Sequence, residues 1–100
     1  MGYEELGEKL TEFIEYYYDA GYDVEADDSN LEVDNQFTIS ISNGDDSVLV
    51  ILTVVSAYAD MDRTTIHIDF QKPKNSGNAF VYEVMNTFAR ITGIPLYHVH

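Results

Sequence analysis

FTISISNGDDSVLVILTVVSAY, residues 37–58, predicts two antiparallel β-strands joined by a tight turn. In its first part apolar residues alternate with Thr and Ser, which is typical of a strand with one buried and one solvated face. Asn43-Gly44 favours a type I′ turn, because both residue types tolerate the positive φ that this turn requires. From Val48 to Val55 only Thr53 is polar, so Ser47–Tyr58 is expected to be a central strand covered by helices on one side.

Further strands are predicted on both sides of this hairpin. Thr64–Phe70 alternates cleanly between apolar and polar residues and gives a third strand. Leu31 and Val33 alternate with acids, which suits a short strand before the hairpin. Residues 96–100 are compatible with a short C-terminal edge strand. Together these patterns predict a meander of three to four antiparallel strands.

Two segments show the helical spacing of apolar residues. The apolar positions of the first, residues 3–19, fall within an arc of about 100°. They are Leu6, Leu10, Phe13, Ile14 and Tyr17. Gly21 follows as a C′ residue. The second helix, residues 79–91, has a wider apolar arc, N-cap chemistry at 76–78 and a stop at Gly93. The chain is therefore expected to be one α+β domain over residues 1–100, with both helices on the same sheet face.

The net charge of −13 lies entirely in the first half of the chain. Residues 1–46 hold fourteen acidic residues and one basic residue, Lys9, whereas residues 47–100 hold four of each. So uneven a distribution indicates a charged face and a partner of opposite sign. It argues against direct binding to nucleic acid or to an anionic membrane, because phosphates would repel it. A salt-adapted acidic surface is the alternative, which the neutral second half fits less well.

The acidic residues of the first helix lie opposite its apolar positions. They form the acidic row, which consists of Glu5, Glu8, Glu12, Glu15 and Asp19. Like charges are neighbours at four steps along this row, which costs the helix roughly 1–2 kcal/mol. Five charges over about 21 Å give a spacing of about 5 Å, against about 3.4 Å per phosphate along one DNA strand. The row therefore favours a surface that occupies a basic, nucleic-acid-binding groove, with a merely solvated helix face as the alternative.

Other candidate partner-binding residues surround the end of the acidic row. They are the acids Asp23, Glu25, Asp27 and Asp28 and the tyrosines Tyr16 and Tyr18. Tyrosine beside carboxylates is typical of an interface anchor for Arg and Lys. The acids lack the spacing of an EF-hand calcium loop. Asp45 and Asp46 are expected to extend the acidic face.

The only basic cluster is Lys72-Pro73-Lys74. It is too small to anchor nucleic acid. Such a cluster either keeps a loop solvated or pairs with the acidic half of a second copy. A homodimer is therefore one of the partner assignments that the sequence leaves open.

No residue pattern supports catalysis, and we expect neither an enzyme nor a bound cofactor. The chain has no cysteine, which excludes a thiolate metal site and fits a reducing compartment. G-x-S-x-G, P-loop and G-x-G-x-x-G motifs are absent. His67, Asp69, His98 and His100 would form a zinc site only if their strands were neighbours, which leaves a metal-dependent enzyme as an alternative. The absence of a secretory leader and of a long apolar run predicts a cytoplasmic protein.

In charge, size and order of elements the chain is similar to small acidic inhibitors encoded by phages and mobile elements. These include some anti-CRISPR and anti-restriction proteins, and immunity proteins that neutralise nuclease toxins are similar in the same way. The resemblance includes no motif, so no residue role is carried over. It implies a non-enzymatic, DNA-mimic-like inhibitor that binds a basic nuclease or effector complex in the host cytoplasm. A chaperone-like or adaptor domain, which would hold a partner chain on an apolar sheet face, is the alternative, and a toxin-immunity protein is the second.

Overall fold

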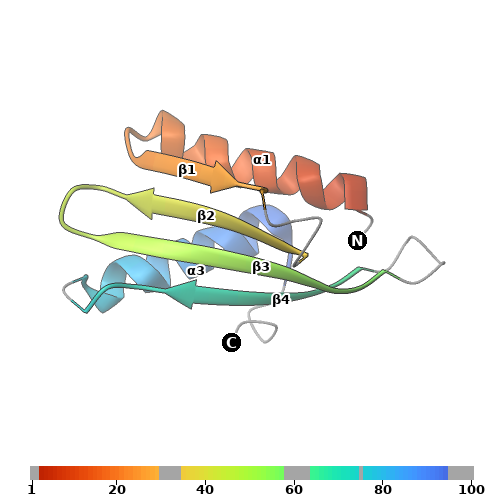
Figure 1. The fold of residues 1–100 in the computed structure, drawn as a ribbon. Coiled ribbons are helices and arrows are strands. Elements are labelled where there is room, and N and C mark those ends of the chain that lie inside the picture. Colours follow the sequence, from red (N-terminus) through yellow and green to blue (C-terminus); the bar gives the residue numbers. More distant parts are fainter. Residues whose placement is uncertain (1–2, 30–34, 58–63, 75, 95–100) are drawn as a thin grey trace.

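The computed structural model describes residues 3–29, 35–57, 64–74 and 76–94. Its helices are α1 (Tyr3–Asp19) and α3 (Asn78–Thr92). Its strands are β1 (Asp23–Asp27), β2 (Gln36–Ser42), β3 (Ser47–Ala57) and β4 (Thr64–Gln71). The strands form one antiparallel sheet in the order β1-β2-β3-β4, and both helices pack on the same face of it (Figure 1). The predicted α+β class and the order helix, meander, helix are confirmed.

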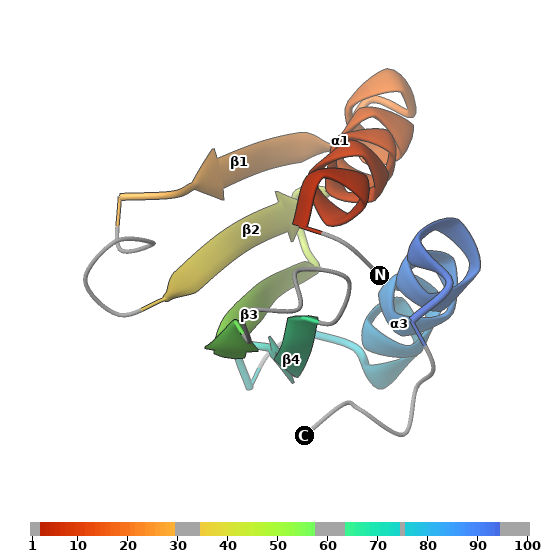
Figure 2. The same ribbon diagram turned by 90° about the vertical axis from the view of Figure 1, so that its right-hand side faces the viewer.

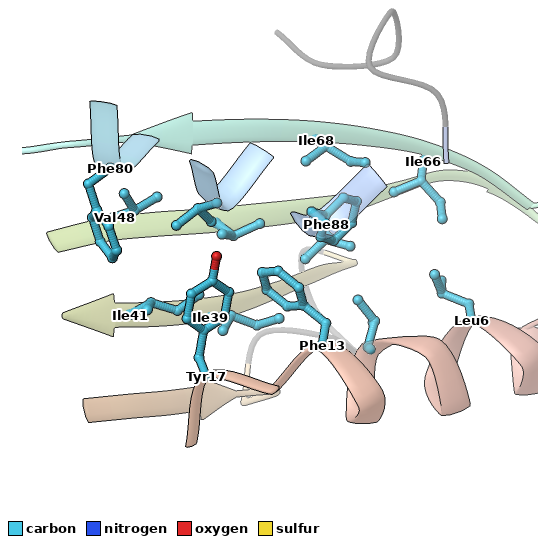
Figure 3. Packing of buried hydrophobic residues seen from close by; sticks show 14 residues of the cluster. Leu6, Phe13, Tyr17, Ile39, Ile41, Val48, Ile66, Ile68, Phe80 and Phe88 are labelled. Carbon is cyan, nitrogen blue, oxygen red and sulfur yellow. The ribbon is translucent and has the colours of Figure 1, made fainter. Parts of the chain in front are cut away.

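The core lies between the sheet and the two helices. Viewed along the strands, α1 covers the β1 and β2 side of the sheet and α3 covers the β3 and β4 side (Figure 2). Phe13 of α1 meets Phe88 of α3 edge to face at 5.2 Å between ring centroids, which joins the helices above the sheet (Figure 3). Ile39, Val50 and Ile68, from three different strands, belong to the same buried cluster as these rings. The apolar residues that predict each element therefore meet in one cluster.

β3 is a central strand, as its sequence predicts. It pairs with β2 from Ser42↔Ser47 to Gln36↔Thr53, and with β4 on its other side. Val48, Val50 and Leu52 are buried under the helices, whereas Leu49 and Ile51 are half-buried on the opposite, open face of the sheet. A strand with apolar residues on both faces thus occupies the position where burial is greatest.

β1 is not among the predicted strands. Its acids alternate with Val24 and Ala26, which pair with Ile41 and Ile39 of β2. Gly21, with φ +91°, turns the chain back after α1 so that β1 runs beneath that helix. The short strand expected around Leu31 and Val33 lies outside the described residues, and so does the C-terminal strand expected at 96–100.

The β2–β3 turn differs by one residue from the prediction. The Asn43 N–H donates to the Asp46 carbonyl oxygen at 3.0 Å, which leaves Gly44 and Asp45 as the two central residues. Gly44 has φ +96°, and Asn43 is not among the residues with positive φ. A glycine at the first central position is the arrangement of type II′ turns, so the type I′ prediction is wrong. Glycine rather than asparagine takes the strained position because it has no Cβ.

The start of α3 is held by the β2–β3 turn rather than by a cap of its own. Gly77 is the N-cap residue and contributes no side chain. Its N–H donates to Asp46 Oδ1 at 2.8 Å, and the buried Ser76 hydroxyl accepts from the Ser47 N–H at 2.7 Å. Asp46 therefore has a structural partner in addition to adding charge to the surface. Gly93 ends the helix in the left-handed conformation, as predicted.

Candidate functional site

The acidic row lies on the outer surface of α1. All five of its side chains are exposed, because Leu6, Leu10, Phe13 and Tyr17 fix the opposite side of the helix in the core. The last turn of α1 contains no basic residue that would compensate the row. The geometry that helical periodicity predicts for these carboxylates is therefore present in the structure.

Lys9 is the basic residue closest to the acidic row in sequence. Helical spacing favours an i,i+4 pair with Glu5. In the structure the Lys9 Nζ lies 3.7 Å from Glu12 Oε2, which is an i,i+3 pair between partly exposed side chains. An exposed pair of this kind contributes little, and one lysine leaves the row strongly negative.

β1 adds a second set of carboxylates beside α1. These are the β1 acids, defined as Asp23, Glu25 and Asp27. They are exposed and lie opposite Ser42, Ser40 and Thr38 of β2 on the open face of the sheet. Their alternation with Val24 and Ala26 is the one sequence signal that could have indicated this strand, and the density of acids hides it. Asp28 follows β1 and is also exposed.

Asp27 is fixed locally at the end of β1. The Ser29 N–H donates to Asp27 Oδ1 at 2.9 Å. Hydrogen bonds from the Ser29 side chain and backbone lower the pKa of Asp27 below its ordinary value. This carboxylate therefore keeps its negative charge in acid longer than an isolated aspartate does.

The acidic row and the β1 acids do not share one flat face. α1 covers the helix-facing side of β1, whereas the β1 acids lie on the open face (Figure 2). Both sets belong to the same edge of the molecule, so the negative surface wraps around that edge. A partner with a concave basic surface would fit this shape better than a flat one would.

Tyr18 lies where the two sets of carboxylates meet. Its side chain is 69% exposed and lines a recess of ≈ 420 Å³. The recess is also lined by Tyr22, Asp23, Val24, Glu25, Ser40 and Ser42. Two carboxylates and several hydroxyls at a recess provide acceptors for an Arg or Lys side chain. Tyr18 is therefore exposed beside these acceptor groups.

Tyr16 has a partner within the molecule. The guanidinium carbon of Arg90, on α3, lies 5.5 Å from the Tyr16 ring centroid, within the range of a cation–π contact. Tyr16 is 44% exposed, and its other edge meets Tyr17. Because Arg90 covers one ring face, Tyr16 offers less surface to a partner than Tyr18 does. No sequence rule links residues 74 positions apart, so this contact was not predicted.

The described residues contain no group of three or more His, Cys, Asp or Glu side chains placed to hold a metal ion. His67 and Asp69 lie two residues apart on β4, on its open face, but His98 and His100 lie outside the described part of the chain. The zinc arrangement considered from the sequence is therefore not assembled from the residues that the structure places. Among those residues, no helix is long and apolar enough to cross a membrane.

No protein-family model matches the chain, and no curated protein and no solved structure matches it either.

Proposed function

We propose that this protein is a non-enzymatic inhibitor that occupies the basic, nucleic-acid-binding surface of another protein. The observation that carries the proposal is the exposed acidic row of α1, continued around one edge of the molecule by the β1 acids. Its spacing of about one charge per 5 Å along the helix approaches that of a phosphate backbone. Folding does not require such a row, because its like-charge neighbours destabilise the helix.

The candidate residues divide into three roles. The acidic row supplies the charge that a basic groove would neutralise, and the β1 acids with Asp28 extend it around the edge. Tyr18, beside the recess formed with Asp23 and Glu25, is the proposed anchor for a partner's Arg or Lys. Tyr16 is the weaker anchor because Arg90 already covers one face of its ring.

The adaptor alternative has less support from the open sheet face. Within the described part of that face, Leu49 and Ile51 are the half-buried aliphatic residues. Their neighbours in register are Ser40 and Thr38 on β2 and Gln71 and Asp69 on β4. So small an apolar area, bordered by polar groups, is not the extended patch that typically marks a chain-binding surface.

The proposal predicts binding that depends on salt and on the acidic row. The immobilised protein is incubated with lysate of candidate host cells at low and high salt, and heparin serves as a competing polyanion. The test variant is Glu8→Gln/Glu12→Gln/Glu15→Gln. The matched control is Asp60→Asn/Asp62→Asn/Glu83→Gln, which changes the net charge equally but in the second half of the chain. We expect a nucleic-acid-binding enzyme to be captured by the wild type and the control, and lost with heparin, high salt or the test variant.

Capture that survives high salt and the test variant would contradict the proposal and favour an apolar, adaptor-like surface. Equal loss of binding in both variants would also contradict it, because total charge and not the acidic row would then matter. The identity of the captured enzyme separates the related candidates. A CRISPR or restriction enzyme indicates the phage-inhibitor type, and a nuclease toxin indicates an immunity protein.

A further inference from the structure

The open face of the sheet has a second recess beside the one at Tyr18. It has a volume of ≈ 280 Å³, and its lining includes Leu49 and Pro73. Ser40 lines both recesses, so they adjoin. We call the recess at Tyr18 the acidic recess and the recess at Leu49 the apolar recess.

One row of residues in register runs through both recesses. On β1, β2, β3 and β4 it consists of Glu25, Ser40, Leu49 and Gln71, which lie directly opposite one another. Because neighbouring strands are about 4.8 Å apart, Glu25 and Leu49 are about 10 Å apart across the sheet. A chain segment that crosses the strands can therefore contact both recesses at once.

The acidic recess suits a guanidinium group better than an ammonium group. Asp23 and Glu25 provide carboxylates, and among the described residues neither has an ion-pair partner. The exposed ring of Tyr18 adds an aromatic face. A planar guanidinium can stack on a ring and donate to carboxylates at the same time, which a lysine ammonium cannot. The Tyr22 ring stacks on Phe80 at 5.8 Å between centroids, so this side of the recess is already in place before a ligand binds.

The apolar recess differs from the acidic recess in charge. Its basic residue, Lys72, donates from Nζ to the Ser76 carbonyl oxygen at 3.1 Å, which holds the ammonium beside the loop before α3. A positive group there opposes a basic side chain at this end of the row. Leu49 is half-buried and Pro73 has no N–H, so this recess offers contact to one aliphatic side chain. The two recesses therefore favour a segment with its basic residue over β1 and its aliphatic residue over β3.

We propose that the partner lays an extended segment across the open face, with an arginine in the acidic recess and an aliphatic side chain in the apolar recess. In a polyproline II segment, side chains three residues apart lie on the same side and about 9 Å apart, which matches the row from Glu25 to Leu49. The inference rests on the proposed function, because it assigns the segment to the partner whose basic surface meets the acidic row. The acidic row attracts any basic groove, whereas the two recesses discriminate among basic surfaces by shape.

Peptides of fixed spacing test this inference. The probes are Pro-Arg-Pro-Pro-Leu-Pro with blocked ends and its reverse sequence, each also made with citrulline or lysine for arginine and with alanine for leucine. Amide chemical shifts of the isotope-labelled protein measure binding at millimolar peptide. The test variants are Glu25→Gln and Leu49→Thr. Their matched controls are Glu8→Gln, in the acidic row, and Ile51→Thr, at a half-buried position of β3 that lines neither recess.

We expect one of the two probes to shift the amides of Tyr18, Glu25, Ser40 and Leu49. Citrulline, which keeps the shape of arginine without its charge, should weaken binding about tenfold. Alanine for leucine should weaken it about fivefold. Glu25→Gln and Leu49→Thr should have effects of the same size, and the two controls should bind like the wild type. The inference is wrong if neither probe shifts these amides, if citrulline or lysine binds as well as arginine, or if the controls lose as much binding as the test variants.

Capture from lysate separates this inference from the proposed function. The double variant Glu25→Gln/Leu49→Thr should capture less of the nucleic-acid-binding enzyme than Glu8→Gln/Ile51→Thr does. Equal capture by these two variants, with loss in Glu8→Gln/Glu12→Gln/Glu15→Gln, would overturn the assignment of the two recesses and leave the proposed function in place. Capture that depends on the recesses but not on the acidic row would contradict the proposed function instead.

Discussion

Tyr17 is the residue where packing and polarity conflict most directly. Its ring is fully buried and meets Phe13, Tyr16 and Tyr22 edge to face at 5.0–5.5 Å between centroids. Its hydroxyl points into the core (Figure 3) and makes no hydrogen bond of ordinary geometry with the described residues. Burial raises the pKa of Tyr17 to about 12, and the nearby Thr87 hydroxyl opposes this only in part. Thr87 itself is buried beside Tyr17.

The raised pKa of Tyr17 predicts a loss of stability in alkali. The unfolded chain ionises this phenol near pH 10, whereas the folded protein keeps it protonated to about pH 12. The folded state thus binds more protons between these values, so its stability falls as the pH rises through them, by up to about 3 kcal/mol. Urea unfolding at a series of pH values measures this loss. Tyr17→Phe should lack it and, since it removes an unpaired hydroxyl, should be close to neutral at pH 7. An equal alkaline loss in Tyr17→Phe would assign the effect to another group.

At the scale of elements, the β2–β3 turn and the start of α3 stabilise each other. Asp46 accepts a hydrogen bond from the Gly77 N–H, and its negative charge lies at the positive end of the helix. Two hydrogen bonds between Ser47 and Ser76 hold the same junction. The chain segments involved are about 30 residues apart, so the turn and the helix can form this contact only when the sheet and α3 are both in place.

This junction predicts a difference between two adjacent aspartates. Asp46→Ala should lower the free energy of unfolding by about 1 kcal/mol, as loss of a helix cap does. Asp45→Ala removes the same charge from an exposed position and should change it by less than about 0.5 kcal/mol. Chemical denaturation of both variants checks this prediction. Equal effects would mean that the general charge of the turn, and not the cap, is what matters.

Periodicity in the sequence was sufficient to predict the elements that face the core. α1 has its predicted bounds, and β2, β3, β4 and α3 differ from theirs by one or two residues, because Ile39, Val50, Phe88 and similar residues follow the period of each element. β1 was missed because its acids hide the alternation, and only its pairing with β2 makes it a strand. The cap from Asp46 and the Arg90–Tyr16 contact were missed because both join segments that meet only in the folded chain.

The candidate site was predictable in part for the same reason. Helical spacing places all five members of the acidic row on one side of α1, where the structure has them. The sequence does not indicate that the β1 acids lie on the other face of the sheet, since that depends on the pairing of β1 with β2. Neither does it distinguish Tyr18 from Tyr16, because the difference is the position of Arg90 on α3.

At the scale of the whole molecule, charge is segregated by edge. The acidic row and the β1 acids occupy one side, and β4 with α3 occupies the nearly neutral other side. Repulsion within the acidic side opposes folding at low ionic strength, because the Debye length of about 30 Å at 0.01 M exceeds the spacing of these charges.

Salt should therefore raise the melting temperature. Thermal unfolding measured from about 0.01 M to 0.15 M salt should show an increase as the Debye length falls to about 8 Å. Glu8→Gln/Glu12→Gln/Glu15→Gln should melt higher than the wild type at low salt and respond less to added salt, since it removes like-charge neighbours. A salt response of equal size in this variant would show that the acidic row is not the source of the repulsion.

The central position of β3 has a consequence for the chain before it folds. Its run Val48–Val55 has no charge and no proline, the composition of a segment prone to amyloid-like aggregation when exposed. During synthesis residues 1–46, with their charge of −13, emerge before this run, and Asp45 and Asp46 directly precede it. Charged residues beside an apolar strand suppress aggregation. The acidic half should therefore keep the nascent chain soluble until β2 and β4 pair with β3.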